Sequence, residues 1–116
     1  MSDRQAEERI FMALADSTRR RLLTTLAESS PKTATQLARE FPITRQGILK
    51  HLEILAAAGL VQIRAKGREK RYWLALEPLH DVSAWIEAIG AKWDARLQRL
   101  KALVEDDQAW QDDSQR

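Results

Sequence analysis

The sequence predicts a mainly α-helical domain that carries one small β-hairpin. Most of the chain spaces its apolar residues three or four positions apart, as a helix does when it buries one side. Residues 60–76 instead alternate with a period of two and are rich in strand-forming side chains. A chain of 116 residues, 44% hydrophobic and 31% charged, has the length of one domain and enough apolar surface for a single core. We expect residues 1–104 to form that domain and residues 105–116 to form an acidic, disordered tail.

Two helices are expected before residue 30. The first covers residues 4–14 and carries Ile10, Phe11 and Leu14 on one side. The second begins after Asp16, whose carboxylate is a suitable N-cap. Its expected buried residues are Leu22, Leu23 and Leu26.

A short third helix over residues 35–41 is followed by a tight turn and a longer fourth helix. Pro42 forces the turn, and Thr44 is a suitable N-cap for the fourth helix. Gly59 is a plausible C-cap for it. The apolar stripe expected to face the core from this helix is Ile48, Leu52 and Leu55.

The hairpin and a long last helix complete the chain. The strands are expected near Val61 to Ile63 and over residues 71–76, and Pro78 suits the first turn of the helix that runs to about Val104. Its apolar stripe is longer than a compact body of this size needs, so part of it is expected to face another chain. The stripe is Leu79, Val82, Ile86, Ile89, Trp93, Leu97, Leu100 and Val104.

Charge and composition restrict the partners. Nineteen Lys and Arg against seventeen Asp and Glu give +2, and the acidic tail leaves residues 1–104 with a net charge of +6. A basic body favours a polyanionic partner, with ordinary solubilising charge as the alternative. No cysteine is present, no apolar stretch approaches the roughly 20 residues of a membrane span, and the charged start is unlike a signal peptide. We expect a cytoplasmic protein with no membrane partner.

A tight turn between two helices, followed directly by a basic hairpin, is the element order of a winged helix-turn-helix. Because the apolar stripe of the fourth helix faces the core, the residues near its N-terminus project outward, where such a helix meets base edges in the major groove. The hairpin is expected to contact phosphates or the minor groove, unless its cations only protect a strand edge. The candidate DNA-binding residues are Thr44, Arg45, Gln46, Leu49 and Lys50 in the helix and Arg64, Lys66, Arg68 and Arg71 in the hairpin.

Several stretches resemble a known family. They are residues 13–23 (ALADSTRRRLL), 44–52 (TRQGILKHL), 58–61 (AGLV) and 66–68 (KGR), with Leu55 and Tyr72. Together they resemble the ArsR family of bacterial winged-helix repressors over about residues 8–104, although MarR-type regulators share the helix-turn-helix and wing. The resemblance implies a homodimer held by the first and last helices. The expected interface residues are Ile10, Phe11, Leu14, Val82, Ile86, Ile89, Trp93, Leu97 and Leu100.

The ArsR family includes metal sensors, and this chain departs from the pattern of their metal ligands. Thiolate sensors carry paired cysteines on the third helix, where this chain has Thr33 and Thr35. The last helix offers only His80, Asp81 and Glu87 as ligands. We therefore expect a metal-independent member of the family that needs no cofactor. It either binds DNA constitutively or responds to an inducer of unidentified chemistry. For His51, a structural or phosphate-facing role is favoured over metal ligation.

The expected function is a sequence-specific, double-stranded DNA-binding transcriptional regulator, a homodimeric repressor on an inverted-repeat operator. An enzyme is not expected, since no glycine-rich phosphate loop and no Ser/His/Asp grouping occur. The alternative is a winged-helix module that binds another protein through exposed aromatic anchors instead of DNA. Its candidate anchors are Trp73, Trp85, Trp93 and Trp110.

Overall fold

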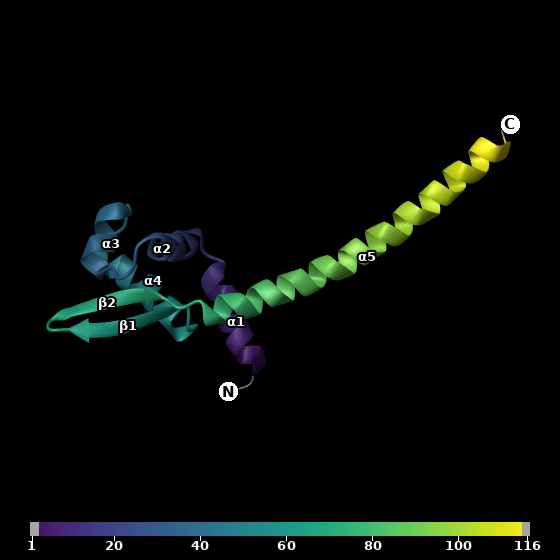
Figure 1. Ribbon diagram of the computed structural model, residues 1–116. Coiled ribbons are helices and arrows are strands. Elements are labelled where there is room, and N and C mark those ends of the chain that lie inside the picture. The colour runs from purple at the N-terminus through teal and green to yellow at the C-terminus, as the bar shows by residue number, and fades with distance from the viewer. Residues whose placement is uncertain (1–2, 115–116) are drawn as a thin grey trace. The chain divides into compact units, whose positions relative to one another are not determined.

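The structure is a computed structural model that describes the backbone of residues 3–114 and the side chains of residues 4–105. Within this part of the chain, four helices precede an antiparallel hairpin and a fifth helix (Figure 1). The elements are α1 (Asp3–Leu14), α2 (Ser17–Glu28), α3 (Ala34–Glu40), α4 (Arg45–Ala57), β1 (Val61–Lys66), β2 (Glu69–Leu74) and α5 (Glu77–Ser114). The chain divides into two compact units, residues 1–80 and residues 81–116. The predicted fold class, mainly α with a hairpin wing, is confirmed.

The core of the first unit lies among α2, α3, α4 and the hairpin, with α1 packed against α2 and α4. Apolar residues spaced three and four apart on each helix converge there, and burying one leucine stabilises the fold by about 1.5–3 kcal/mol. The predicted inward residues of α2 and α4 are all buried. The largest fully buried side chains are Leu22, Leu26, Leu37, Ile48, Leu52, Leu55 and Leu60.

The helix ends follow local side-chain chemistry. The Asp16 carboxylate accepts a hydrogen bond from the backbone N–H of Arg19 at 3.0 Å, and the Thr44 hydroxyl accepts one from the N–H of Gly47 at 3.1 Å. Both predicted N-caps are therefore confirmed. The end of α4 differs by one position from the prediction: Ala58 is the C-cap, and Gly59 follows it with a φ of +77°, which glycine adopts without strain.

Helix α3 begins earlier than the sequence analysis placed it. Its N-cap is Thr33, whose hydroxyl accepts from the N–H of Gln36 at 3.1 Å while the Gln36 side chain accepts from the N–H of Thr33 at 2.9 Å. This reciprocal pair is a capping box, and it starts the helix at Ala34 instead of Thr35. The helix ends before Phe41, which is buried as its C-cap.

The hairpin is attached to the body along β2. Strand β1 pairs with β2, and Gly67 occupies the connecting turn with a φ of +64°. On the far side of β2, Lys32 and Tyr72 exchange two backbone hydrogen bonds of 3.1 and 2.9 Å. The sequence analysis did not anticipate this contact. This one-residue bridge ties the two-stranded sheet to the segment between α2 and α3, and a two-stranded hairpin alone is only marginally stable.

Residues 81–114 of helix α5 lie in the second unit, and the helix continues beyond its predicted end. The apolar stripe ends at Val104, but the backbone remains helical to Ser114. Glu, Gln and Ala favour helix, and neither glycine nor proline interrupts residues 105–114, so the backbone has no local reason to stop at Val104. The helix boundary is corrected accordingly, whereas a separate acidic tail stays a prediction because its side chains lie outside the described residues. Among the described residues, no helix is long and apolar enough to cross a bilayer.

Candidate nucleic-acid interface

The helix-turn-helix pair is formed by α3 and α4, and α4 presents two chemically different sides. Its stripe of Ile48, Leu52 and Leu55 is at most 1% exposed. The opposite side begins at the N-terminal end of the helix, as predicted, and carries four of the candidate DNA-binding residues. Arg45, Gln46 and Lys50 are exposed and Leu49 is half-buried.

The position of Arg45 is fixed by the preceding helix. Its Nε donates a hydrogen bond to Oγ1 of Thr35 at 3.2 Å, across the turn that joins α3 to α4. A guanidinium held at one nitrogen keeps its other N–H donors available for an incoming acceptor. Thr35 therefore supports Arg45, one of the candidate DNA-binding residues on α4.

The wing, defined as residues 61–74, concentrates positive charge on its outer surface. Arg64 and Arg71 lie directly opposite each other in the strand register. Like charges in that position destabilise a hairpin. Two contacts reduce the cost: the Arg64 guanidinium lies 5.6 Å from the centre of the Trp73 ring, and Arg71 Nη2 is 3.8 Å from a Glu69 carboxylate oxygen. An arrangement that costs stability in the free protein points to a partner that neutralises it.

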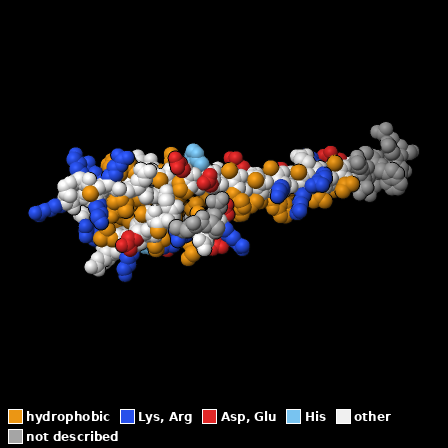
Figure 2. Space-filling view, turned by 90° about the horizontal axis from the view of Figure 1, so that it is seen from below, with side chains coloured by type: hydrophobic (Ala, Val, Ile, Leu, Met, Phe, Trp, Pro, Cys, Tyr) orange, Lys and Arg blue, Asp and Glu red, His pale blue; other side chains and the backbone are white. Residues whose placement is uncertain are grey.

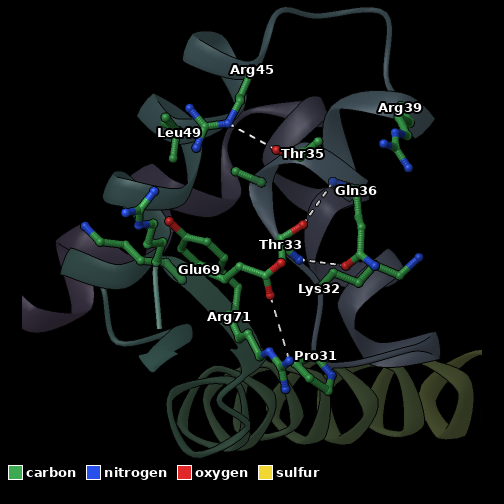
Figure 3. A pocket seen from close by; sticks show the side chains of 14 residues that line it. Pro31, Lys32, Thr33, Thr35, Gln36, Arg39, Arg45, Leu49, Glu69 and Arg71 are labelled. Atoms are coloured by element: carbon green, nitrogen blue, oxygen red, sulfur yellow. Dashed lines mark hydrogen bonds and ion pairs between the residues drawn. The ribbon is translucent and has the colours of Figure 1, made fainter. Parts of the chain in front are cut away.

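A cavity with a volume of about 820 Å³ lies between α3, the start of α4 and the wing, and its walls form a concave surface. Figure 3 shows side chains from all three elements around it. Its lining contains six cationic side chains and one acidic side chain, Glu69. The six cations are Lys32, Arg39, Arg45, Arg68, Lys70 and Arg71.

Part of the predicted site converges on this surface and part does not. Arg45, Leu49, Arg68 and Arg71 line it. Arg64, Lys66 and Arg68 are exposed on the wing, and Arg71 is half-buried. The remaining predicted residues lie outside the lining, on the helix and on the wing. They are Thr44, Gln46, Lys50, Arg64 and Lys66.

The lining also contains residues that the sequence analysis did not include among the site residues. Lys32 and Arg39 add positive charge, while Thr35 and Gln36 add polar groups from α3. Lys32 is engaged, since its Nζ lies 2.8 Å from a Glu40 carboxylate oxygen. The α3 residues could have been predicted from the sequence, because the first helix of a helix-turn-helix crosses the DNA backbone.

His51 lies away from the outward side of α4 and contacts the junction of α1 and α2. Its Nδ1 is 3.9 Å from a carboxylate oxygen of Asp16 and 3.4 Å from a guanidinium nitrogen of Arg19. The hydrogen bond from the backbone N–H of Arg19 lowers the pKa of Asp16; desolvation opposes this effect in part, and the Arg19 charge adds to the lowering. These contacts are those of a structural residue. Within residues 4–105, no three His, Asp or Glu side chains gather as a metal site would require.

Apolar surface is exposed on both helices expected to dimerise. Along α5, hydrophobic side chains form a row on one side (Figure 2). The exposed fractions of its large members range from 37% at Ile89 to 62% at Leu103. The row consists of Trp85, Ile86, Ile89, Trp93, Leu97, Leu100, Leu103 and Val104. Val82, another predicted interface residue, is half-buried.

On α1 the predicted interface residues differ in exposure. Phe11 is 38% exposed, Leu14 is half-buried, and Ile10 is only 7% exposed because it packs into the core of its own chain. Ile10 therefore has little surface left for a partner. Met12, which was not predicted, is 70% exposed on the same helix.

Comparison with known proteins gives consistent relatives. The profile of a helix-turn-helix domain family matches residues 14–64. The HTH-type transcriptional regulator YuzN of Bacillus subtilis is 40% identical over 88 residues, which is 70% of this chain and 96% of the relative. The transcriptional repressor SdpR of Bacillus subtilis is 34% identical over 77 residues, 66% of this chain and 84% of the relative.

Solved structures agree with the sequence relatives. An ArsR-like transcriptional regulator from Rhodococcus sp. RHA1 superimposes with a TM-score of 0.76 at 39% identity, covering 88% of this chain and 93% of that one. A protein of related sequence thus shares the fold of this chain over most of its length. The chain belongs to the ArsR family of winged helix-turn-helix transcriptional regulators, which bind DNA.

Proposed function

We propose that the chain is a homodimeric repressor that binds an inverted-repeat operator and does so without a metal ion. The proposed DNA binding rests on the set of six cationic side chains that line one concave surface; they come from α3, the residue Lys32 before it, α4 and the wing. Phosphate contacts supply much of the affinity of such proteins, and base-edge contacts supply specificity. Family membership favours this function over a module that binds only protein.

In the proposed complex, the N-terminal end of α4 enters the major groove. The guanidinium of Arg45 donates to guanine, the amide of Gln46 pairs with adenine, and Leu49 meets a thymine methyl. Lys50 lies on the same outward side. The Thr44 hydroxyl keeps the helix start in register by capping it. Wing cations hold the phosphates; these are Arg64, Lys66, Arg68 and Arg71.

Dimerisation is supported by the apolar row on α5 and by Phe11 and Met12 on α1. Exposed apolar patches of this kind mark interfaces in proteins that are otherwise polar outside. A two-fold dimer places its two α4 helices about 34–36 Å apart, in successive major grooves of an inverted repeat. The name of the relative SdpR supports repression as the outcome of binding.

The test begins with selection of bound fragments from genomic DNA by the purified full chain, at 50 and 200 mM salt. An inverted repeat recovered at both concentrations is the expected result, with an affinity that falls steeply between them, by roughly 10³–10⁵-fold for about 6–10 phosphate contacts. Recovery of unrelated sequences at low salt only would reject sequence-specific regulation. A chelator, or added Zn²⁺, is expected to leave the operator affinity unchanged.

Two variants then separate the helix from the wing. Arg45→Ala is expected to cost about 1–3 kcal/mol of operator binding and to relax the preference at one base position. Arg68→Ala is expected to weaken binding to all sequences and to lower the salt slope by about one. Arg4→Ala is the control, because its side chain is 89% exposed on α1, outside the concave surface. Unchanged base preference in Arg45→Ala would show that the recognition side of α4 is misassigned.

A further inference from the structure

The first turn of α2 closes the end of α1 with two arginines. The last carbonyl groups of a helix have no partner inside the helix, and cationic donors stabilise them. Arg19 Nε donates to the carbonyl oxygen of Ala13 at 2.8 Å, and Arg19 Nη2 donates to that of Met12 at 2.9 Å. Arg20 Nη1 donates to the carbonyl oxygen of Leu14 at 2.6 Å.

The two arginines differ in what else they reach. The third guanidinium nitrogen of Arg19 lies 3.4 Å from Nδ1 of His51, in the middle of α4. Among the described residues, the side chain of Arg20 forms a hydrogen bond with α1 alone. One planar guanidinium therefore bridges α1 and α4, and the backbone N–H of the same residue is held by the α2 cap, Asp16.

The chemistry of this bridge specifies the state of the histidine. An arginine side chain only donates, so a hydrogen bond between these two side chains requires that His51 Nδ1 accepts and that the ring proton lies on Nε2. His51 is also confined by its surroundings, since its side chain is only 24% exposed and Asp16 lies 3.9 Å away. His51, which follows Lys50 on α4, is thereby attached to the end of α1.

We infer that Arg19 is a positioning residue for DNA recognition, which fixes the orientation of α4 relative to α1, the helix whose exposed Phe11 and Met12 are proposed to meet the second protomer. The inference rests on the proposed DNA-binding function and adds a residue outside the recognition side of α4. It implies that the dimer interface and the recognition helix are joined by a rigid contact within each protomer. Hydrogen bonds from a planar fork resist rotation in a way that a lysine ammonium does not.

The test compares Arg19→Gln with Arg20→Gln in the full-length protein, using the selected operator. Both variants lose donors to the end of α1, but only the first loses the link to α4. Arg19→Gln is expected to bind the operator about tenfold more weakly, and Arg20→Gln within about twofold of the wild type. Arg19→Lys is expected to resemble Arg19→Gln, because its charge remains while the fork is lost. The salt slope is expected to stay unchanged in all three.

A double-variant cycle and a spectroscopic readout complete the test. The double variant Arg19→Gln with His51→Ala is expected to bind the operator no more weakly than the weaker single variant, because each substitution removes the same contact. Nitrogen-15 spectra of the wild type are expected to show His51 protonated on Nε2. Equal losses in Arg19→Gln and Arg20→Gln, additive losses in the cycle, or a proton on Nδ1 would each overturn the inference.

Two further outcomes identify what has failed. A salt slope reduced by about one in Arg19→Gln would make Arg19 a phosphate ligand and would overturn its positioning role. If the wild type selects no operator, the proposed function fails together with the inference. If the wild type selects an operator that depends on Arg45 and Arg19→Gln binds it normally, the inference alone is wrong.

Discussion

Arg45 and Thr35 are joined across the helix-turn-helix by a hydrogen bond of 3.2 Å from Nε to Oγ1. The two residues come from different helices, and both line the concave basic surface (Figure 3). A long, exposed arginine loses side-chain freedom when it binds DNA, and a hydrogen bond formed beforehand reduces that loss. The support for the base-contacting residue is therefore built into the turn itself.

Removing this support is expected to weaken recognition without disturbing the fold. Thr35→Val keeps the shape of the side chain but removes the acceptor, and one hydrogen bond of about 1 kcal/mol corresponds to about fivefold in operator affinity. Thr25→Val is the matched control, because the Thr25 hydroxyl donates to the Arg21 carbonyl within α2, away from the concave surface. Titration of labelled operator DNA measures both variants. Equal affinities would show that Thr35 does not prepare Arg45 for binding.

Gly47 is expected to exchange stability for access to DNA. It lies in the first turn of α4, and an added Cβ would lie 3.4 Å from both Ile43 Cγ2 and Thr44 Oγ1, which is ordinary contact. Gly47→Ala is therefore expected to raise the free energy of unfolding by about 1 kcal/mol. Its operator affinity is expected to fall, since the extra methyl group keeps the DNA backbone at a distance. Thermal stability and operator affinity are expected to change in opposite directions, and a variant improved in both would contradict a close approach of the α4 backbone at Gly47 to DNA.

The apolar row on α5 predicts the response of the assembly to a buried charge. Leu97 is 57% exposed in the single chain, so Leu97→Glu has no cost to the isolated helix but places a carboxylate in the proposed interface. Sedimentation is expected to show a dimer for the wild type and a monomer for the variant. Ala95→Glu is the control, because the helical period places position 95 on the opposite side of α5. A dimer that tolerates both substitutions would assign the interface elsewhere.

The acid sensitivity of the fold is expected to depend on Asp16. The N–H of Arg19 lowers the pKa of this carboxylate in the folded chain, so its stabilising contribution is complete above its ordinary value near 3.8 and is lost as the pH falls through the lower folded value. Asp16→Asn keeps a cap acceptor but has no charge. The free energy of unfolding is therefore expected to fall less between about pH 4 and pH 2 in the variant than in the wild type. Parallel curves from acid titrations with chemical denaturant would contradict this assignment.

The helices of the body were predictable because their signals are local. Asp16 and Thr44 cap the helices that follow them, and the spacing of Ile48, Leu52 and Leu55 fixes which side of α4 faces the core. Once that side is known, the outward position of Arg45 follows from the helical period. The capping box at Thr33 was equally local but was not recognised, which moved the start of α3 by one residue.

The concave surface was not predictable from periodicity because tertiary contacts assemble it. Lys32 lies at the site because its backbone pairs with Tyr72, forty positions later in the chain. No pattern of side chains in the sequence predicts such a contact. In the sequence, Arg39 looks like any exposed residue of a short helix. Only the packing of α3 beside α4 places it at the concave surface. Ile10 shows the converse limit, since an apolar spacing identifies a buried side without saying whether its own chain or a partner buries it.

The backbone pairing of Lys32 with Tyr72 also bears on how the protein behaves at high concentration. A strand edge with free N–H and C=O groups recruits other chains, and a wing must stay exposed to reach DNA. Lys32 covers the outer edge of β2 at Tyr72, whereas the outer edge of β1 has no strand beside it in the described sheet. That strand carries Arg64 and Lys66, whose mutual repulsion between molecules discourages strand-to-strand aggregation. The same cations proposed to attract DNA would then keep unbound copies apart, and neutralising them is expected to lower solubility as well as affinity.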